Sequence, residues 1–433
     1  MESRSFRTPL SDHFIAHKKF ASIRPVHKAS DRPGALARSL LMNRRHFLTA
    51  SAASLAAASS SRAADAPLKV GIIGDTPRGG YGHGLDTMWL KIPGAQIVAV
   101  ADPDEKGLAN ALKKLSCTQG HADYKAMLAA AKPDIVSIGP RHVDQHHPMI
   151  MASIAAGARG IYIEKPFCRS LIEADEIVAA AEKSGTQIGI AHRNRYHPAL
   201  PLVKKLVHEG AIGRVLEYRM RGKEDPRGGS LDLWVLGSHL FNLAAYFGGL
   251  PIACSAGVYQ AGKPLTKADV IEGAEGIGPL GGNEVHARFE MTNGTPAFFD
   301  SIQNAGTKAA GFGLQIIGTE GVIDFRIDQE PLAHIRLGSP FSPKVEPAAW
   351  VPITTAGIGQ PEPIAGLGRD VSSHAVGARD LIEAMANQRA PLCSAADGRT
   401  TIEMISAVFE SHRLQGRRVT FPLETRVNPL TLL

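Results

Sequence analysis

A glycine-rich turn and a later aspartate have the residue types and spacing of a dinucleotide-binding site. The turn spans residues 74–84 and follows an apolar run at residues 68–73. Glycine lets backbone N–H groups approach a pyrophosphate, and a helix expected at about 85–91 would add partial positive charge at its N-terminus. The turn is longer than a plain Gly-x-Gly-x-x-Gly pattern and contains Pro77, so it is a weak signal by itself.

Asp102 strengthens this interpretation. It ends a second apolar run at residues 96–101 and lies 18 residues after Gly84, where an acidic side chain binds the adenine ribose hydroxyls. No adjacent arginine is present to hold a 2′-phosphate, so NAD is favoured and NADP is the alternative. The competing interpretation is a glycine-rich loop in an α/β domain without a ligand. The candidate cofactor ligands in this region are Gly74, Thr76, Arg78, Gly79, Gly80 and Asp102.

The elements around these residues predict a parallel sheet. Short apolar runs alternate with helical segments up to about residue 191, which is the pattern of strands joined by crossover helices. The expected strands are residues 68–73, 96–101, 134–138, 160–163 and 187–191, and helices are expected at about 104–115, 123–131 and 171–183.

The pattern changes after about residue 192. Strands then dominate, and Asn293-Gly294 between two of them is a hairpin-turn dipeptide. The fold class predicted is therefore an α/β Rossmann domain plus an α+β domain with a mostly antiparallel open sheet. Two irregular stretches, at about 261–283 and 338–370, are expected to be lids or binding loops. Helices at about 372–388 and 396–413 close the fold.

The first 64 residues have a different character. They contain 11 Lys and Arg and 3 Asp and Glu, which leaves 37 basic and 38 acidic residues in the remainder, so a nucleic-acid partner is not expected. Asn43-Arg44-Arg45-His46-Phe47-Leu48, a short apolar stretch and small residues before Asp65 are similar to a twin-arginine export signal. A disordered basic tail is the alternative. The apolar stretch is too short to anchor the protein in a membrane.

These observations predict five segments and a compartment. Met42 directly precedes the signal and is a candidate start of translation. The segments are 1–41, an upstream extension; 42–64, the signal peptide; 65–191, the NAD(P)-binding domain; 192–423, the substrate and oligomerisation domain; and 424–433, a tail. Export by the twin-arginine machinery implies a periplasmic protein. Its four scattered cysteines predict neither disulfides nor a zinc site.

The motif Glu164-Lys165-Pro166 directly follows the fourth expected strand, later in the sequence than the glycine-rich turn and Asp102. With this motif in this order, the chain resembles the Gfo/Idh/MocA oxidoreductases, which include glucose–fructose oxidoreductase and inositol dehydrogenase. The resemblance covers about residues 68–423. It is carried further by Gly139-Pro140, Asn194-Arg195-Tyr196-His197-Pro198, residues 210–213, Gly237-Ser238-His239 and residues 318–321. It implies that nicotinamide lies between the two domains with substrate above it.

The resemblance assigns roles to several residues. Gly139, Pro140, Glu164 and Lys165 join the candidate cofactor ligands, and Lys165 and His239 become candidate catalytic residues. A partly desolvated lysine has a lowered pKa and could exchange the hydroxyl proton, whereas His239 could be the base or an orienting donor. The family often has Asp where this chain has Val235 and Asn242, so Asp232 is the nearest candidate acid. Each residue also has a competing structural interpretation: an ion pair for Lys165, a core position for His239 and a solvated loop position for Asp232.

The remaining candidates concern substrate and metal. Arg193, Asn194, Tyr196 and His197 begin the second domain and are candidate contacts to the cofactor amide or substrate hydroxyls. A histidine-rich segment at residues 142–147 lacks a matching distant ligand set, so no metal is expected. Cys168 follows the Glu-Lys-Pro motif but is interpreted as a small buried side chain.

Three functions fit this set of residues. The first is an NAD(P)-dependent oxidoreductase acting on a sugar, polyol or sugar derivative, with tightly bound cofactor. The second is an NAD-dependent glycosidase that oxidises its substrate transiently, and the third is a non-catalytic sugar-binding relative. An open sheet face also predicts a homo-oligomer.

Overall fold

The computed structural model describes residues 66–306, 312–342 and 348–433. The predicted signal at 42–64 and the extension at 1–41 lie outside this range. No helix in the described ranges is long and apolar enough to span a bilayer. The four cysteines, Cys117, Cys168, Cys254 and Cys393, are buried and free.

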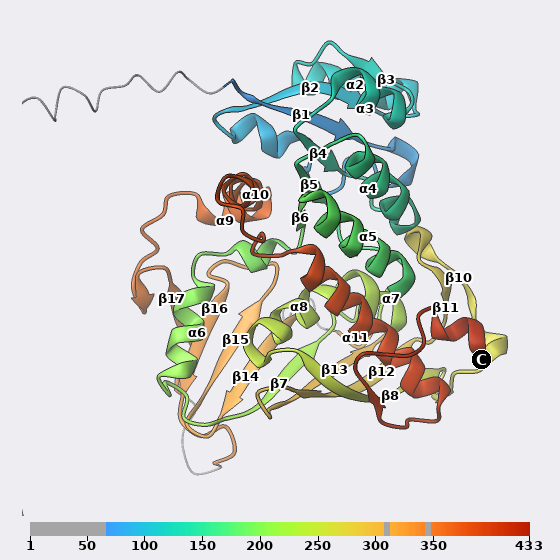
Figure 1. Cartoon of the computed structure of the whole chain (residues 1–433). Coiled ribbons are helices and arrows are strands. Elements are labelled where there is room, and N and C mark those ends of the chain that lie inside the picture. Colours follow the sequence, from blue (N-terminus) through green and yellow to red (C-terminus); the bar gives the residue numbers. More distant parts are fainter. Residues whose placement is uncertain (1–65, 307–311, 343–347) are drawn as a thin grey trace, which may run out of the picture. The chain divides into compact units, whose positions relative to one another are not determined.

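The first part of the chain forms the predicted parallel sheet (Figure 1). Its six strands lie in the order β3-β2-β1-β4-β5-β6, which confirms the Rossmann arrangement. β4 and β5 are buried along their whole length, as expected for strands covered on both faces. The strands are β1 (Leu68–Ile73), β2 (Ala95–Ala101), β3 (Gly120–His121), β4 (Ile135–Ile138), β5 (Gly160–Ile163) and β6 (Gln187–Ile190).

Helices α2 (Glu105–Leu115), α3 (Tyr124–Ala131), α4 (His146–Ala155) and α5 (Leu171–Ser184) connect these strands. Short polar side chains begin three of them by accepting hydrogen bonds from the first turn, which fixes where each helix starts. These N-caps are Asp104 for α2, Asp123 for α3 and Ser170 for α5.

The helix expected at about 85–91 is wrong in type and length. The chain there forms only a 3-10 helix, η2 (Thr87–Lys91), after a shorter one inside the turn, η1 (Thr76–Arg78). Ile92 is already extended, and Pro93 after it both disfavours a helical residue 92 and lacks an N–H to continue the helix. The partial charge expected from a full helix N-terminus is therefore smaller than the sequence suggested.

The second sheet is mostly antiparallel, as predicted, with one parallel pair. Its path is β18-β17-β16-β15-β14-β7-β13-β12-β8-β19, with β9 paired to β8, and β7 runs parallel to β13. The strands are β7 (Val215–Arg221), β8 (Pro251–Gln260), β9 (Lys263–Pro264), β12 (Glu284–Met291), β13 (Pro296–Ile302), β14 (Gly313–Gly318), β15 (Gly321–Arg326), β16 (Ala333–Leu337), β17 (Val351–Thr354), β18 (Gly357–Ile358) and β19 (Val419–Thr420).

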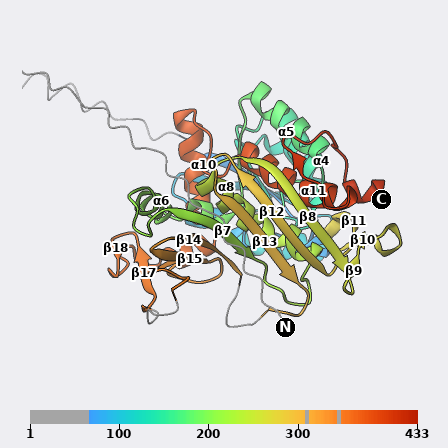
Figure 2. The same cartoon turned by 90° about the horizontal axis from the view of Figure 1, so that it is seen from below.

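One face of this sheet carries the helices and the other is open (Figure 2). β12 and β13 alternate between buried and partly exposed residues, which is the pattern of a sheet packed on one side only. The second domain's helices are α6 (Leu200–His208), α7 (Ser230–Val235), α8 (Gly237–Gly248), α9 (Leu367–Ser372), α10 (Ala375–Asn387) and α11 (Ala395–Arg413). Of these, α11 packs against both β8 and α5, and α10 packs against β5, β6 and η2.

Both stretches expected to be irregular contain regular elements. The segment 261–283 includes β10 (Ile271–Gly273), η6 (Ala274–Gly276) and β11 (Gly278–Leu280), which form a two-stranded hairpin. The described part of 338–370 includes β17, β18 and the start of α9. The C-terminal segment supports the hairpin, because the Asn428 amide donates a hydrogen bond to the Pro279 carbonyl oxygen at 2.8 Å.

Candidate functional site

Asp102 fixes the glycine-rich turn to the end of β2. It is 1% exposed, and its Oδ2 accepts a hydrogen bond from the Thr76 hydroxyl at 2.7 Å. Its Oδ1 accepts a second from the Thr76 backbone N–H at 3.1 Å. Asp102 and Thr76, two of the candidate cofactor ligands, are thus brought together by a direct contact that spacing alone did not reveal.

A cavity of about 210 Å³ opens at these strand ends. Its lining, as far as the chain is described, includes three aspartates and neither lysine nor arginine. The lining residues are Gly74, Asp75, Ala101, Asp102, Pro103, Ala122, Asp123, Tyr124, Gln145 and Met149. Asp75 Oδ1 is buried without a hydrogen-bond partner. An acidic lining with an unused acceptor fits the hydroxyl groups of an adenosine and disfavours a 2′-phosphate.

Gly82 lets the turn lie against the ends of β4 and β5. Its φ is +61°, and an added Cβ would lie 2.5 Å from Glu164 Cγ and 2.7 Å from the Gly139 carbonyl oxygen. A side chain is therefore excluded both by conformation and by space. Gly139 in turn donates its N–H to the Ile73 carbonyl oxygen at 2.9 Å, so the turn and these two strand ends form one packed unit.

Arg78, Gly79 and Gly80 form the outer part of the turn. The guanidinium of Arg78 binds both carboxylate oxygens of Asp144, at 2.6 and 2.7 Å. Gly79 has φ +94° and approaches Arg141 closely, because a Cβ on Gly79 would lie 2.7 Å from the Arg141 backbone nitrogen. Arg78 thus already has a protein partner, and its contact with a cofactor stays a prediction, as do those of Gly79 and Gly80.

Glu164 is a buried carboxylate that orders the base of the site. Its Oε1 accepts hydrogen bonds from His83 N and His83 Nδ1, at 2.9 and 2.5 Å, and its Oε2 accepts one from Lys165 N at 2.9 Å. Burial raises the pKa of the Glu164 carboxyl, but the hydrogen bond and charge of His83 lower it more, so the net pKa is well below the usual value. The structure therefore gives Glu164 an ionised, positioning role within the protein.

Lys165 and His239 meet in a second cavity, of about 180 Å³. Lys165 extends from the loop after β5, and its Nζ donates a hydrogen bond to the Val235 carbonyl oxygen at 2.9 Å. Burial lowers the pKa of the Lys165 ammonium, although Glu164 and Glu275 oppose this. The lining residues are His83, Arg141, Lys165, Ala191, Arg193, Lys223, Arg227, Val235, Leu236, His239, Glu275, Phe312, Asp328 and His374.

Two histidine rings near this cavity have unused ring nitrogens. His239 Nδ1 and both ring nitrogens of His192 are buried without a hydrogen-bond partner, and the two ring centroids are 5.0 Å apart. Burial lowers the pKa of His239 well below its usual value, and Lys165 lowers it further; the same two causes lower the pKa of His192 to about 3. Both imidazoles are therefore neutral near pH 7, and His239, which lines the cavity, has a ring nitrogen available to a ligand.

The Asp232 carboxylate makes its contacts outside the cavity of Lys165. Its Oδ2 accepts hydrogen bonds from the Ser301 hydroxyl at 2.6 Å and from the Glu224 backbone N–H at 3.0 Å. Asp232 does not line the cavity of Lys165, and within the described residues it forms no hydrogen bond with His239. Its carboxylate instead joins α7 to β13, and a catalytic role for it stays a prediction without structural support.

The four substrate candidates after β6 separate into different environments. Arg193 lines the cavity of Lys165 and pairs with Asp328 at 2.6 Å. Asn194 and His197 line a neighbouring cavity, where Asn194 Nδ2 donates to the Ile327 carbonyl oxygen at 3.2 Å and His197 Nε2 lies 3.1 Å from Glu330 Oε1. Tyr196 is different: it is buried and donates its hydroxyl to the Ile190 carbonyl oxygen at 3.0 Å, so it is a core residue.

Several lining residues escaped the sequence prediction. Glu275 reaches the cavity from the hairpin within 261–283, and it has φ +56°, an uncommon conformation for a residue other than glycine. In the sequence, only the unusual length of the segment 261–283 pointed to this region. Arg141, Arg227 and His374 come from three further segments and carried no signal at all.

The histidine-rich segment at 142–147 serves a structural purpose. His146 is buried, and its two ring nitrogens contact the Pro140 and Pro166 carbonyl oxygens at 2.8 and 2.7 Å. It thereby joins the loops that follow β4 and β5. In the portion of the chain that the structure describes, no group of three or more His, Cys, Asp or Glu is arranged to hold a metal ion.

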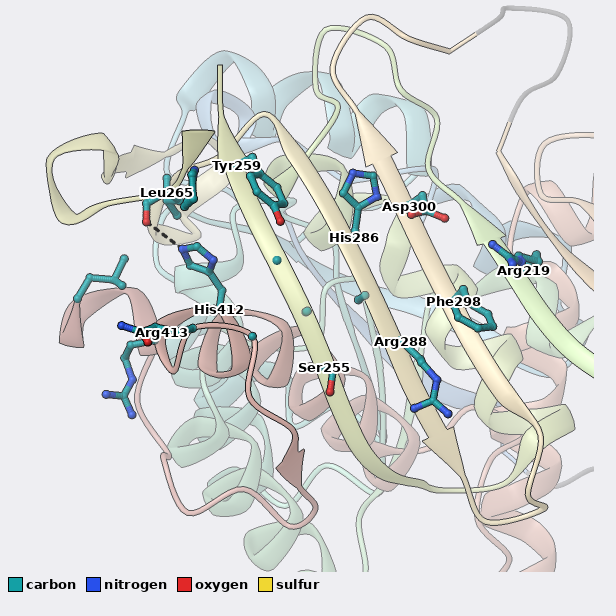
Figure 3. A pocket seen from close by; sticks show the side chains of 17 residues that line it. Arg219, Ser255, Tyr259, Leu265, His286, Arg288, Phe298, Asp300, His412 and Arg413 are labelled. Atoms are coloured by element: carbon teal, nitrogen blue, oxygen red, sulfur yellow. Dashed lines mark hydrogen bonds and ion pairs between the residues drawn. The ribbon is translucent and has the colours of Figure 1, made fainter. Parts of the chain in front are cut away.

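A further cavity, of about 750 Å³, lies away from Lys165 on the open face of the second sheet (Figure 3). Phe298 and Asp300 of β13, His286 of β12 and Arg219 of β7 project from this face. His286 lies between Asp300 Oδ1 at 2.6 Å and Glu284 Oε1 at 2.8 Å.

Comparison with known proteins identifies the first domain. Residues 68–192 match the model of the Gfo/Idh/MocA family, described as an oxidoreductase family with an NAD-binding Rossmann fold. D-apiose dehydrogenase of Paraburkholderia graminis is 33% identical over 125 residues, which are 29% of this chain and 33% of that relative. The chain therefore spans about a third of that relative's length.

Longer matches extend into the second domain. Levoglucosan dehydrogenase of Pseudarthrobacter phenanthrenivorans is 25% identical over 359 residues, which cover 74% of this chain and 88% of that relative. A solved structure of levoglucosan dehydrogenase in complex with NADH superimposes with a TM-score of 0.64 at 22% identity, covering 82% of this chain and all of that one. This second likeness supports the two-domain fold.

Proposed function

We propose that this chain, whose NAD-binding domain belongs to the Gfo/Idh/MocA oxidoreductase family, transfers hydride between a C–OH group of a sugar, polyol or sugar derivative and NAD. The observation that carries the proposal is the meeting of Lys165 and His239 in one cavity at the carboxyl edge of the parallel sheet. The relatives named as D-apiose and levoglucosan dehydrogenases support the substrate class.

The cofactor site fits the residues present. The acidic cavity at Asp102 would hold the adenosine, and the turn at 74–84 would approach the pyrophosphate through its backbone. Glu164 holds the turn through His83, and His146 joins the loops after β4 and β5. When bound, NAD supplies the hydride acceptor; the protein supplies position and proton transfer.

Oxidation of an alcohol also requires an acceptor for the hydroxyl proton. A base works best when its pKa lies near the working pH. Burial moves the pKa of Lys165 down from above neutrality, toward that range, whereas it moves the pKa of His239 further away from it. We therefore assign proton exchange to Lys165 and orientation of the substrate hydroxyl to the neutral His239 ring.

The first test measures cofactor and turnover together. Protein purified under native conditions is denatured, and released dinucleotide is identified by mass spectrometry; we expect NAD bound tightly enough to survive purification. Sugars and polyols are then screened by NADH absorbance, and aryl glycosides by release of the aglycone. Glycoside cleavage without net NADH would replace the dehydrogenase with the glycosidase mechanism, and bound substrate without either reaction would indicate a binding protein.

We also infer that residues 42–64 direct export by the twin-arginine machinery to the periplasm. The paired Arg44 and Arg45 before Phe47 and Leu48 support this inference. Four free, buried cysteines suit a protein that folds in the reducing cytoplasm before export. Replacing both arginines by lysine should retain the protein in the cytoplasm, as measured by cell fractionation, and unchanged export would contradict the signal.

We further propose that a second copy of the chain covers the open sheet face. The cavity of about 750 Å³ on that face supports this, and the half-buried Phe298 ring lies in it, 4.3 Å from the Arg219 guanidinium carbon. Light scattering should find an oligomer in the native protein and a smaller species for Phe298→Asp. A monomeric native protein would contradict the proposal.

A further inference from the structure

The cavity that contains Lys165 is strongly basic. Arg141, Lys165, Arg193, Lys223 and Arg227 line it, against the acidic Glu275 and Asp328. These five cations come from both domains: the loops after β4, β5 and β6 and the segment after β7. Convergence of so many like charges costs electrostatic energy unless a counter-charge offsets it.

The carboxylates within reach do not balance these charges one for one. Arg227 has a partner of its own, since its NH2 and Nε bind Asp225 at 2.6 and 3.1 Å. Arg193 and Lys223 share one carboxylate, that of Asp328, at 2.6 and 3.5 Å. Burial lowers the pKa of Lys165, and the carboxylates of Glu164 and Glu275 oppose that shift.

Arg141 stands apart from the others. Among the described residues its side chain has no hydrogen-bond or ion-pair partner, and it is exposed at the carboxyl end of β4. Its backbone is fixed by the close approach of Gly79, so the side chain extends from a rigid base. A guanidinium with all donors free is suited to binding an anionic group in a bidentate manner.

The same cations also affect the pKa values of nearby histidines. After burial, the neighbouring cations Lys165 and Arg193 are among the causes that lower the pKa of His239, and Arg193 also lowers the pKa of His374. A neutral sugar would leave these cations uncompensated, whereas an anionic one would supply the missing counter-charge.

We propose that the substrate of this site is a sugar derivative bearing an anionic group, a carboxylate or a phosphate, which Arg141 binds together with the cation pair Arg193 and Lys223. The inference rests on the proposed function, because it takes this cavity to be the substrate site. Lys165 and His239 contact the reacting C–OH group, and Arg141 binds the charged end of the same molecule.

The test compares acids with their neutral parents. Binding to the NAD-loaded full-length protein is measured by calorimetry at low salt for D-glucuronate, D-galacturonate, D-gluconate and D-glucose 6-phosphate, and for D-glucose, D-galactose and D-glucitol. We expect at least one acid to bind about tenfold or more tightly than its parent, since hydrogen bonds to charged groups are the stronger ones. Whether a carboxylate or a phosphate is preferred identifies the anion.

Two variants make the result specific. Arg141→Gln should remove most of the preference for the acid, and Arg159→Gln should keep it, because Arg159 precedes β5 at the opposite edge of the sheet. Equal binding of acids and parents, no binding of any acid, or a preference that survives Arg141→Gln would overturn the inference.

NADH formation in the same mixtures separates the two proposals. Turnover of neutral sugars without an acid preference would remove the anionic site and leave the redox function. Tight, Arg141-dependent binding of an acid without any NADH would keep the anionic site and remove the redox function.

Discussion

The two cavities at the carboxyl edge of the parallel sheet have opposite charge. The one beside Asp102 is lined by three aspartates, with neither lysine nor arginine in its described lining, whereas the one beside Lys165 collects five basic residues. The first is built on the ends of β1, β2 and β3, and the second on the ends of β4, β5 and β6 together with residues of the second domain. The difference in charge arises from the residues that follow these strands, which is where a Rossmann fold places its functional side chains, and, at the second cavity, also from Lys223 and Arg227 after β7.

The difference in charge suggests that the two cavities bind different molecules. Under the proposed function, carboxylates at the first cavity would accept hydrogen bonds from ribose hydroxyls and repel an additional phosphate, so this end would select the cofactor. Cations at the second cavity add to burial in lowering the pKa values of His239 and His374, and they would attract an anionic substrate.

Lys165→Ala should nearly abolish turnover. Loss of the group that exchanges the hydroxyl proton is expected to lower kcat by about 10²- to 10⁴-fold, the usual range for general acid–base catalysis. NAD affinity should stay unchanged, because the acidic cavity is untouched. The measurements are NADH absorbance and NAD titration; Lys205→Ala, at an exposed position of α6, is the control. Undiminished turnover would remove Lys165 from the mechanism.

Asp102→Ala tests the acidic cavity in the same way. Loss of a charged acceptor should raise KM for NAD by roughly 10- to 100-fold and reduce the preference for NAD over NADP. The effect includes loosening of Thr76, whose hydroxyl binds Asp102 at 2.7 Å. The measurement is KM for each cofactor.

Asp134→Asn is the matched control for that variant. Asp134 precedes β4 at the opposite edge of the sheet and accepts a hydrogen bond from the Lys69 N–H at 2.9 Å. We expect it to leave both KM values unchanged. An unaltered NAD preference in Asp102→Ala would show that the aspartate serves only to fix the turn.

The two cavities also differ in how far the sequence predicts them. Asp102 and its turn are separated by 18 residues in one strand–turn–strand unit, so spacing was sufficient to find them. The basic cavity combines the loops after β4, β5 and β6 with α8, the hairpin around Glu275 and His374 before α10. Lys165 and His239 were found there through a family resemblance, whereas Arg141 and Glu275 were missed because tertiary contacts alone bring them together.

Contacts between residues far apart in the sequence also explain part of the difference between the predicted and the observed fold. Local apolar periodicity predicted the parallel sheet, whose strands follow one another with short crossovers. It did not predict the pairing of β7 with β13, since their parallel contact joins residues near 218 and 297. The short η2 reflects Pro93, a residue visible in the sequence whose effect on the first helix was underestimated.

The smallest effect concerns stability against acid. Burial, with contributions from Arg193 and His83, lowers the pKa of His374 to about 4, and an unfolded chain binds that proton near pH 6.5. Between these values the unfolded state holds a proton that the folded state lacks, so stability is complete above pH 6.5 and falls as the pH decreases toward 4. His374 alone should contribute a slope of about 1.4 kcal/mol per pH unit.

His374→Gln should therefore make the free energy of unfolding less dependent on pH. The variant loses the contact between the Tyr162 hydroxyl and His374 Nδ1, 3.2 Å apart, so its stability decreases at every pH, but the slope is the relevant readout. Denaturant unfolding at pH 7, 6, 5 and 4 measures it. His208→Gln, at the exposed end of α6, should keep the native slope. Equal slopes for both variants would show that the folded protein does not hold His374 in its neutral form.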